Sequence, residues 1–164
     1  MTSTKMKRGG SGAGHPRPPQ FSEDGNGPRV LVEHPDPVTL DATRRILAEA
    51  GYDVATCPGP RAGTPTTTGG PGCPLLQGAT CSAVTAADVI VTGLSLGQAD
   101  ESLVVCRLRA AAQDTPIVLE CPRPSAETHA EITQGMQRVF PLTFESLLRS
   151  VRAACDSRPE GESR

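Results

Sequence analysis

Short apolar runs that alternate with helical segments constrain this chain more than any other feature. Residues 29–33 (RVLVE) are rich in Val and read as a buried strand. Residues 37–50 then carry apolar side chains at helical spacing, and residues 52–56 (YDVAT) alternate like a second strand. A strand–helix–strand order is typical of a parallel α/β sheet.

The boundaries of the first helix are marked by residues suited to helix ends. Asp36 is placed to cap the helix, and Pro37 fits its first turn. Gly51 follows the last apolar position and is a natural stop. These signals predict one complete helix between the first two strands.

The alternation continues in the second half of the chain. Apolar runs at 87–94, 115–121 and 138–140 predict three further strands. We expect helices at 98–113, from Ser125 to about 134, and from a Thr143 cap onward. In the first of these, the residues predicted to share one apolar face are Leu103, Val104, Leu108 and Ala111.

Residues 57–85 interrupt this order. Gly, Pro and Thr dominate the segment, and it carries Cys57, Cys73 and Cys81. A long irregular segment inside a compact domain indicates function or disorder. We therefore predict a doubly wound, five-stranded parallel sheet in which a Cys/Gly/Pro-rich insert replaces the second helix. Residues 1–28 are expected to be a disordered arm, and residues 156–164 a charged tail.

Composition excludes several classes of function. The net charge is −2 and only four aromatic residues are present, which argues against a nucleic-acid surface. No apolar stretch is long enough to span a membrane, and the basic N-terminus lacks the apolar run of a secretory signal. We expect a cytosolic, soluble protein, whose cysteines are free thiols, metal ligands or redox sites rather than structural disulfides.

Four stretches resemble response-regulator receiver domains. These are RVLVEHPDPVTLDATRRILAEAGYDVAT, ADVIVTGLSL, TPIVLEC and VFPLTFESLLRSVRAA. The resemblance covers about residues 29–155, except the insert and a shortened stretch after Pro122. It implies a flavodoxin-like fold and a module that contacts a regulatory protein partner. Leu142, Phe144 and Leu148 lie on the surface that receivers often use for this, although core packing explains most of these residues.

The resemblance also implies that the reactive positions of the family have changed. Receivers accept a phosphoryl group on an aspartate after the third strand, and the matching residue here is Gly93. The acidic pair that holds Mg²⁺ in receivers is matched by His34 and Pro35, or by Glu33 and His34 after a one-residue slip. The family's hydroxyl residue is matched by Glu120 or Cys121, its lysine by Leu142, and its proline by Thr143. The resemblance therefore implies a degenerate pocket made of Glu33, His34, Asp36, Gly93, Glu120, Cys121, Leu142 and Thr143.

The cysteines leave three interpretations open. Cys57, Cys73 and Cys81, with Cys121 or Cys106 as a fourth ligand, would suit Zn²⁺ or an iron–sulfur centre. The chain has no C-x₂-C pair, so a thiol–disulfide switch or plain free thiols are the alternatives. Cys106 and Cys155 lie among apolar helix residues and are predicted to be packing residues.

No enzymatic constellation is visible. His34 could act as a ligand or as a proton carrier, and the alternative is an ordinary loop histidine held by hydrogen bonds. The GGSGAG run at 9–14 follows no strand, so we reject it as a phosphate loop. The sequence favours a phosphorylation-independent receiver-like interaction module without a cofactor. Alternatives are a metal or redox sensor built on the insert and an enzyme of unnamed type, and a homodimer stays open.

Overall fold

The computed structural model describes residues 19–60 and 73–157. The predictions for the N-terminal arm, the insert and the charged tail fall, at residues 1–18, 61–72 and 158–164, outside the described residues. The elements in chain order are β1 (Arg29–Glu33), α1 (Pro37–Glu49), β2 (Asp53–Cys57), α2 (Ser82–Ala86), β3 (Val89–Thr92), α3 (Ala99–Ala111), β4 (Ile117–Glu120), α4 (Arg123–Thr128), α5 (Ala130–Thr133), β5 (Gln137–Val139) and α6 (Phe144–Asp156).

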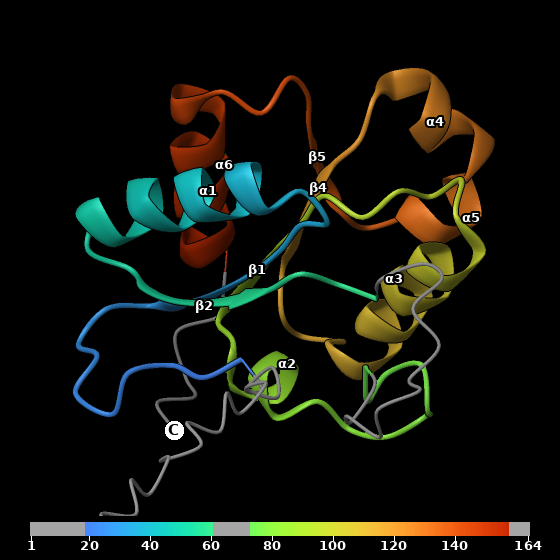
Figure 1. Ribbon diagram of the computed structural model, residues 1–164. Helices are drawn as coiled ribbons and strands as arrows, with labels where there is room; N and C mark the ends of the chain where they lie inside the picture. The colour runs from blue at the N-terminus through green and yellow to red at the C-terminus, as the bar shows by residue number, and fades with distance from the viewer. Residues whose placement is uncertain (1–18, 61–72, 158–164) are drawn as a thin grey trace, which may run out of the picture.

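The five strands form one parallel sheet in the order β2-β1-β3-β4-β5 (Figure 1). This confirms the predicted doubly wound α/β fold. The carboxyl ends of all five strands meet at one edge of the sheet, where ligands of such folds bind. In register, Glu33 lies beside Cys57 of β2 and Thr92 of β3.

Two apolar cores cover the two faces of the sheet. On one face, Val30 and Val32 pack with Leu47 of α1 and with Leu147 and Val151 of α6. We call this the α1/α6 core. On the other face, the α2/α3 core joins the sheet to helices α2 to α5 through Leu31, Ile90, Leu119, Val84, Val104, Leu108 and Ala126. Successive strand residues point to opposite faces, so this partition follows from the alternation of β1.

The predicted caps of the two best-defined helices are confirmed. Asp36 accepts a hydrogen bond from the Thr39 backbone N–H (2.7 Å), and Gly51 after α1 has a φ of +91°. Thr143 and Ser146 form a reciprocal capping box at the start of α6. Local chemistry therefore fixes where both helices of the α1/α6 core begin.

The predicted apolar face of α3 is shifted. Leu103 is 41% exposed and Ala111 is exposed, whereas Val105 and Ala112 are buried together with Val104 and Leu108. The segment offers apolar side chains on more than one face, so periodicity alone does not select the buried one. Contact with the sheet decides instead.

The single helix predicted from Ser125 to about residue 134 is wrong. Two short helices, α4 and α5, are joined at His129, whose φ of −115° and ψ of 39° are not helical. Pro122, not Ser125, stands at the N-cap of α4, and Ser125 lies inside that helix.

The insert contains more structure than predicted. Residues 82–86 form the one-turn helix α2 in the place of the second helix, so the insert does not replace this helix entirely. Leu75 is buried in the α2/α3 core, and the Arg107 guanidinium of α3 donates to its carbonyl oxygen.

The predicted arm is ordered near the domain. Phe21 packs against the α2/α3 core with the Arg29 guanidinium 5.8 Å from its ring centre, and the Ser22 N–H donates to both carboxylate oxygens of Asp53 (3.1 Å). The prediction of a disordered arm is therefore wrong for residues 19–28. Among the described helices, none is long and apolar enough to cross a membrane.

Candidate functional site

His34, Gly93 and Glu120 come together at the carboxyl edge of the sheet. His34 follows β1, Gly93 follows β3, and Glu120 ends β4. The ladder continues past the strands, because the His34 N–H donates to the Cys57 carbonyl (3.1 Å) and the Gly93 N–H to the Glu33 carbonyl (2.8 Å). The neighbouring strands thus hold these three residues side by side, as the sequence predicted; we call them the corner.

The ring of His34 occupies the space over Gly93. A Cβ built on Gly93 would lie 2.8 Å from His34 Nε2, would collide with Cδ2 of the same ring, and would come within 3.3 Å of Glu120 Oε2. Contacts shorter than 3.0 Å require something to move. The corner therefore has no room for any side chain at position 93 while His34 keeps this position.

The orientation of His34 follows from its hydrogen bonds. The Asp36 backbone N–H donates to Nδ1 at 3.0 Å, so in the neutral ring the proton belongs on Nε2. Nε2 in turn lies 3.6 Å from Glu120 Oε2, an atom buried without a hydrogen-bond partner among the described residues. A proton on Nε2 is therefore placed between the ring and this carboxylate.

Asp36 serves the helix rather than the corner. Its carboxylate accepts from the N–H and the hydroxyl of Thr39, and these two hydrogen bonds hold the pKa of Asp36 below its usual value. The sequence placed Asp36 both at a cap and in the pocket; the structure gives its side chain the first role.

Glu33 lies on the other side of the sheet. It is two residues from Leu31 and so shares the α2/α3 face, and it is only 3% exposed. Burial raises the pKa of Glu33 to about 7, and its Oε2 has no hydrogen-bond partner among the described residues. Glu33 is level with Thr92 in the sheet and faces the α2/α3 core, so it does not join His34 at the corner.

The corner does not fit the Mg²⁺ ion that the resemblance implies. Mg²⁺ is held mainly by carboxylate oxygens, and Glu120 is the single carboxylate of the corner. The positions matched to the acidic pair are an imidazole, His34, and Pro35. No step is therefore derived through a metal ion here.

Cys121 and Thr143 do not contribute to the corner. Cys121 is buried in the α2/α3 core, with its thiol toward the Pro122 carbonyl (3.5 Å). Leu142 is half-buried against the α1/α6 core, and Thr143 caps α6.

The match of Leu142 and Thr143 to the family's lysine and proline is two residues off. Phe140 and Pro141 directly follow β5, and the peptide bond between them is cis, as the resemblance requires of the lysine–proline pair. Phe140 therefore stands where the lysine was expected, and its side chain is 60% exposed. Phe140 is not among the residues predicted for the pocket, although VFPLTF has a proline two residues after Val139.

The predicted cysteine ligand set is not assembled. All six cysteines are free thiols, and within 19–60 and 73–157 no three His, Cys, Asp or Glu side chains form a group that could hold a metal ion. Burial, reinforced by nearby Glu33, raises the pKa of the Cys57 thiol to about 12. Cys155 packs against the α1/α6 core as predicted, but Cys106 is exposed, which corrects its interpretation as a packing residue.

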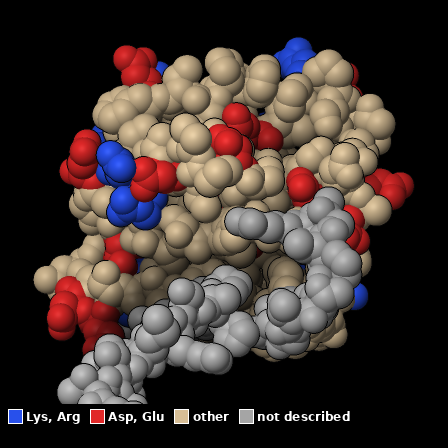
Figure 2. All heavy atoms as spheres, viewed as in Figure 1, with Lys and Arg blue, Asp and Glu red and all other residues tan. Residues whose placement is uncertain are grey.

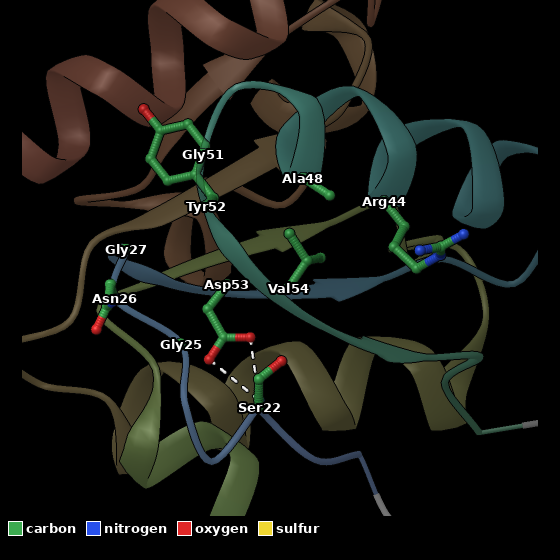
Figure 3. A pocket seen from close by; sticks show the side chains of 10 residues that line it. All are labelled: Ser22, Gly25, Asn26, Gly27, Arg44, Ala48, Gly51, Tyr52, Asp53 and Val54. Atoms are coloured by element: carbon green, nitrogen blue, oxygen red, sulfur yellow. Dashed lines mark hydrogen bonds between the residues drawn. The ribbon is translucent and has the colours of Figure 1, made fainter.

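A cavity of about 350 Å³ opens at the other end of the sheet (Figure 3). Figure 3 shows the Asp53 carboxylate pointing to Ser22 and the Arg44 side chain reaching down from α1. Close approach shapes this cavity, since a Cβ on Gly25 would collide with the Asp53 carboxylate. The cavity arises where residues 22–27 pack on β2, which composition alone did not reveal.

Charged side chains on α1 pair with one another. Asp41 of α1 pairs with Arg44 (3.1 Å) and Arg45 (2.8 Å). On the face shown in Figure 2, basic side chains gather mainly beside acidic ones. The surface in this view therefore shows mixed rather than single-sign charge.

Comparison with known proteins gives a fold but no sequence family. No family model and no curated protein matches the chain. Among solved structures, similar ones include the chemotaxis protein CheY4 of Vibrio cholerae, which is 16% identical with a TM-score of 0.54 over 78% of this chain and 98% of that chain. A response-regulator receiver domain protein from Clostridium thermocellum is 14% identical, with a TM-score of 0.55 over 79% and 94%.

A putative pilus assembly protein, CpaE, from Burkholderia thailandensis E264 is also similar. It is 19% identical with a TM-score of 0.59, covering 79% of this chain and 99% of that chain. The chain therefore has the flavodoxin-like α/β fold of response-regulator receiver domains. At these identities the comparison shows the fold alone.

Proposed function

We propose that this chain is a cytoplasmic, phosphorylation-independent receiver-like module of a bacterial regulatory system, and that it signals by contact with a regulatory protein. One observation carries the proposal: the His34 ring fills the space over Gly93 where an acceptor side chain would start. The fold shared with receiver domains supports the signalling part of the proposal.

The chemistry of the corner supports phosphorylation independence. A covalent acyl phosphate needs a carboxylate nucleophile, and position 93 has no side chain. The resemblance expects a lysine cation after β5, and the residue there is Phe140. His34 and Glu120 instead face each other across the corner at 3.6 Å.

Exposed aromatic side chains support a protein partner. Phe140 is 60% exposed and Phe144 is 56% exposed, and both lie within five residues at the start of α6. Exposed aromatic residues are enriched at protein interfaces and often contribute most of the binding energy. A second copy of the chain is the alternative partner, and sedimentation of the wild type and Phe140→Ser over a range of concentrations distinguishes it.

Phosphotransfer is tested directly by mass. The purified chain is incubated with acetyl phosphate and Mg²⁺, next to a phosphorylatable receiver domain as positive control, and intact masses are recorded. We expect the control to gain one phosphoryl group, about 80 Da, and this chain to gain none. A stoichiometric gain of about 80 Da on the wild type overturns the proposal.

A designed variant sharpens the experiment. His34→Ala with Gly93→Asp removes the ring and supplies the missing carboxylate. If this variant is phosphorylated and the wild type is not, the missing carboxylate and the ring that fills its place together explain the difference. If the wild type is phosphorylated, mapping of the modified peptide shows which carboxylate accepts the group.

A further inference from the structure

Glu33 is buried beneath the part of the insert that the structure describes. Leu31, on the same face of β1, belongs to the core that holds Leu75, Ala83 and Val84. Helix α2 packs on β1 from this side. Residues 73–86, which we call the insert cover, therefore lie over the face of the sheet that carries Glu33.

No positive charge among residues 19–60 and 73–157 is paired with the Glu33 carboxyl. Within the described part of the chain, no ion pair includes Glu33, and its Oε2 accepts no hydrogen bond. Beside it in the sheet are the Cys57 thiol and the Thr92 hydroxyl. Desolvation alone accounts for its raised pKa.

The other ionisable groups on the surrounding elements do not offset a charge there. The insert cover contributes the thiols Cys73 and Cys81. On α3, Glu101 accepts from the Ser95 N–H and Arg107 donates to the Leu75 carbonyl oxygen. Across the sheet, Glu120 is paired with His34. An ionised Glu33 would thus be an uncompensated buried charge, which is strongly unfavourable.

The insert cover can open more readily than the strand that it covers. Helix α2 has only five residues, and its N-cap, Cys81, makes no side-chain capping bond. By contrast, β1 is hydrogen-bonded on both sides, to β2 and to β3. Short elements with few stabilising contacts open at lower free energy than central strands.

We propose that Glu33 is a proton-operated latch for the insert cover. While its carboxyl is neutral, residues 73–86 stay packed on the sheet. When the proton is lost, the carboxylate gains water by releasing this cover, and the half-buried Cys57, Cys73 and Cys81 become more exposed. The proposal stands independently of phosphotransfer, since it concerns the opposite face of the sheet from the corner.

The direction of the pH response follows from the two states. In the open state Glu33 is solvated and has an ordinary pKa of 4.5, whereas in the closed state its pKa is about 7. The open state therefore gains population as the pH rises from about 5 to 7, and the response flattens above 7. Between pH 5.5 and 7.5 we expect the opening equilibrium to rise roughly tenfold or more.

Hydrogen exchange of the full chain tests the latch. Amide protection, corrected for the intrinsic pH dependence of exchange, is measured by peptide for the wild type, Glu33→Gln and Glu49→Gln. The last variant removes an exposed carboxylate of α1 and is the matched control. We expect protection of residues 73–86 to fall with pH in the wild type and in E49Q, and to stay constant in E33Q.

Three results would overturn the proposal. One is the same pH dependence in E33Q as in the wild type. Another is no pH dependence of residues 73–86 in the wild type. The third is equal protection of residues 73–86 and of the central strands β1 and β3, which would mean that the cover opens only when the whole chain unfolds. If E33Q does not fold, Glu33→Met provides an apolar replacement of similar length for the same measurement.

Discussion

The imidazole of His34 lies directly over the Cα of Gly93, so that the two residues together fill the place where a third-strand side chain would emerge. Gly93→Ala should therefore push a methyl group into the ring. We expect a loss of about 1–3 kcal/mol in the free energy of unfolding, the usual range for overpacking. Urea denaturation of the variant and the wild type measures it.

A matched glycine and a double variant isolate this contact. Gly97→Ala meets nothing closer than Ser95 Oγ at 3.8 Å, so its effect should stay within about 0.5 kcal/mol. His34→Ala removes the ring, and Gly93→Ala should then cost clearly less than in the wild-type background. Equal costs in both backgrounds would mean that the ring does not occupy this space.

The burial of Glu33 predicts a pH-dependent stability. Its folded pKa of about 7 lies above the value of 4.5 for an exposed carboxyl, so the folded chain binds the proton more tightly. The resulting stabilisation is complete below about pH 4.5 and is lost as the pH rises toward and through 7. The total is on the order of 3 kcal/mol, at 1.36 kcal/mol per unit.

Chemical denaturation at a series of pH values measures this effect. The difference in unfolding free energy between the wild type and Glu33→Gln should change with pH between 5 and 7, in favour of the variant at the higher pH. A constant difference over that interval would show that Glu33 titrates normally in the folded chain.

The layout of the sheet was accessible from sequence because each element carries a local signal. Residues 29–33 are rich in β-branched apolar side chains and predict a strand. Asp36 and Thr143 are good helix caps and Gly51 is a good helix stop, so the order of the elements and these helix ends could be predicted. Gly93, His34 and Glu120 were placed together because parallel strands end at one edge. Their contact distances needed coordinates.

Other features depend on tertiary contacts that no local pattern encodes. Periodicity did not show that Glu33 turns away from His34 to the opposite face, since a one-residue slip reverses every side chain of a strand. Residues 19–28 have the composition of a linker. Nevertheless, Phe21 packs against the α2/α3 core, and the Ser22 N–H donates to the buried carboxylate of Asp53. Likewise, neither a glycine nor a proline stands at His129, where the helix is interrupted between α4 and α5, so the sequence gives no local signal for this interruption.

The orientation of α3 offers a direct test of the corrected apolar face. Leu108 is fully buried, so Leu108→Ala should lower the unfolding free energy by about 2–5 kcal/mol. Leu103 is 41% exposed, and Leu103→Ala should change it by no more than about 0.5 kcal/mol. Comparable losses for the two variants would favour the face predicted from sequence. Thermal or urea denaturation of the pair is sufficient.

The N-cap residue Thr143 is predicted to stabilise α6, one of the two helices of the α1/α6 core. Thr143 Oγ1 accepts from the Ser146 N–H (3.2 Å), and the Ser146 hydroxyl accepts from the Thr143 N–H (2.8 Å). Thr143→Ala removes the first bond and should destabilise the chain by about 1 kcal/mol, while Thr143→Ser keeps an acceptor and should cost less. Because the Ser146 N–H donates to Thr143 Oγ1 and the Leu147 N–H to the Thr143 carbonyl (2.9 Å), loosening this first turn should also increase amide exchange at Ser146 and Leu147. An unchanged unfolding free energy in Thr143→Ala would show that the capping box does not stabilise this helix.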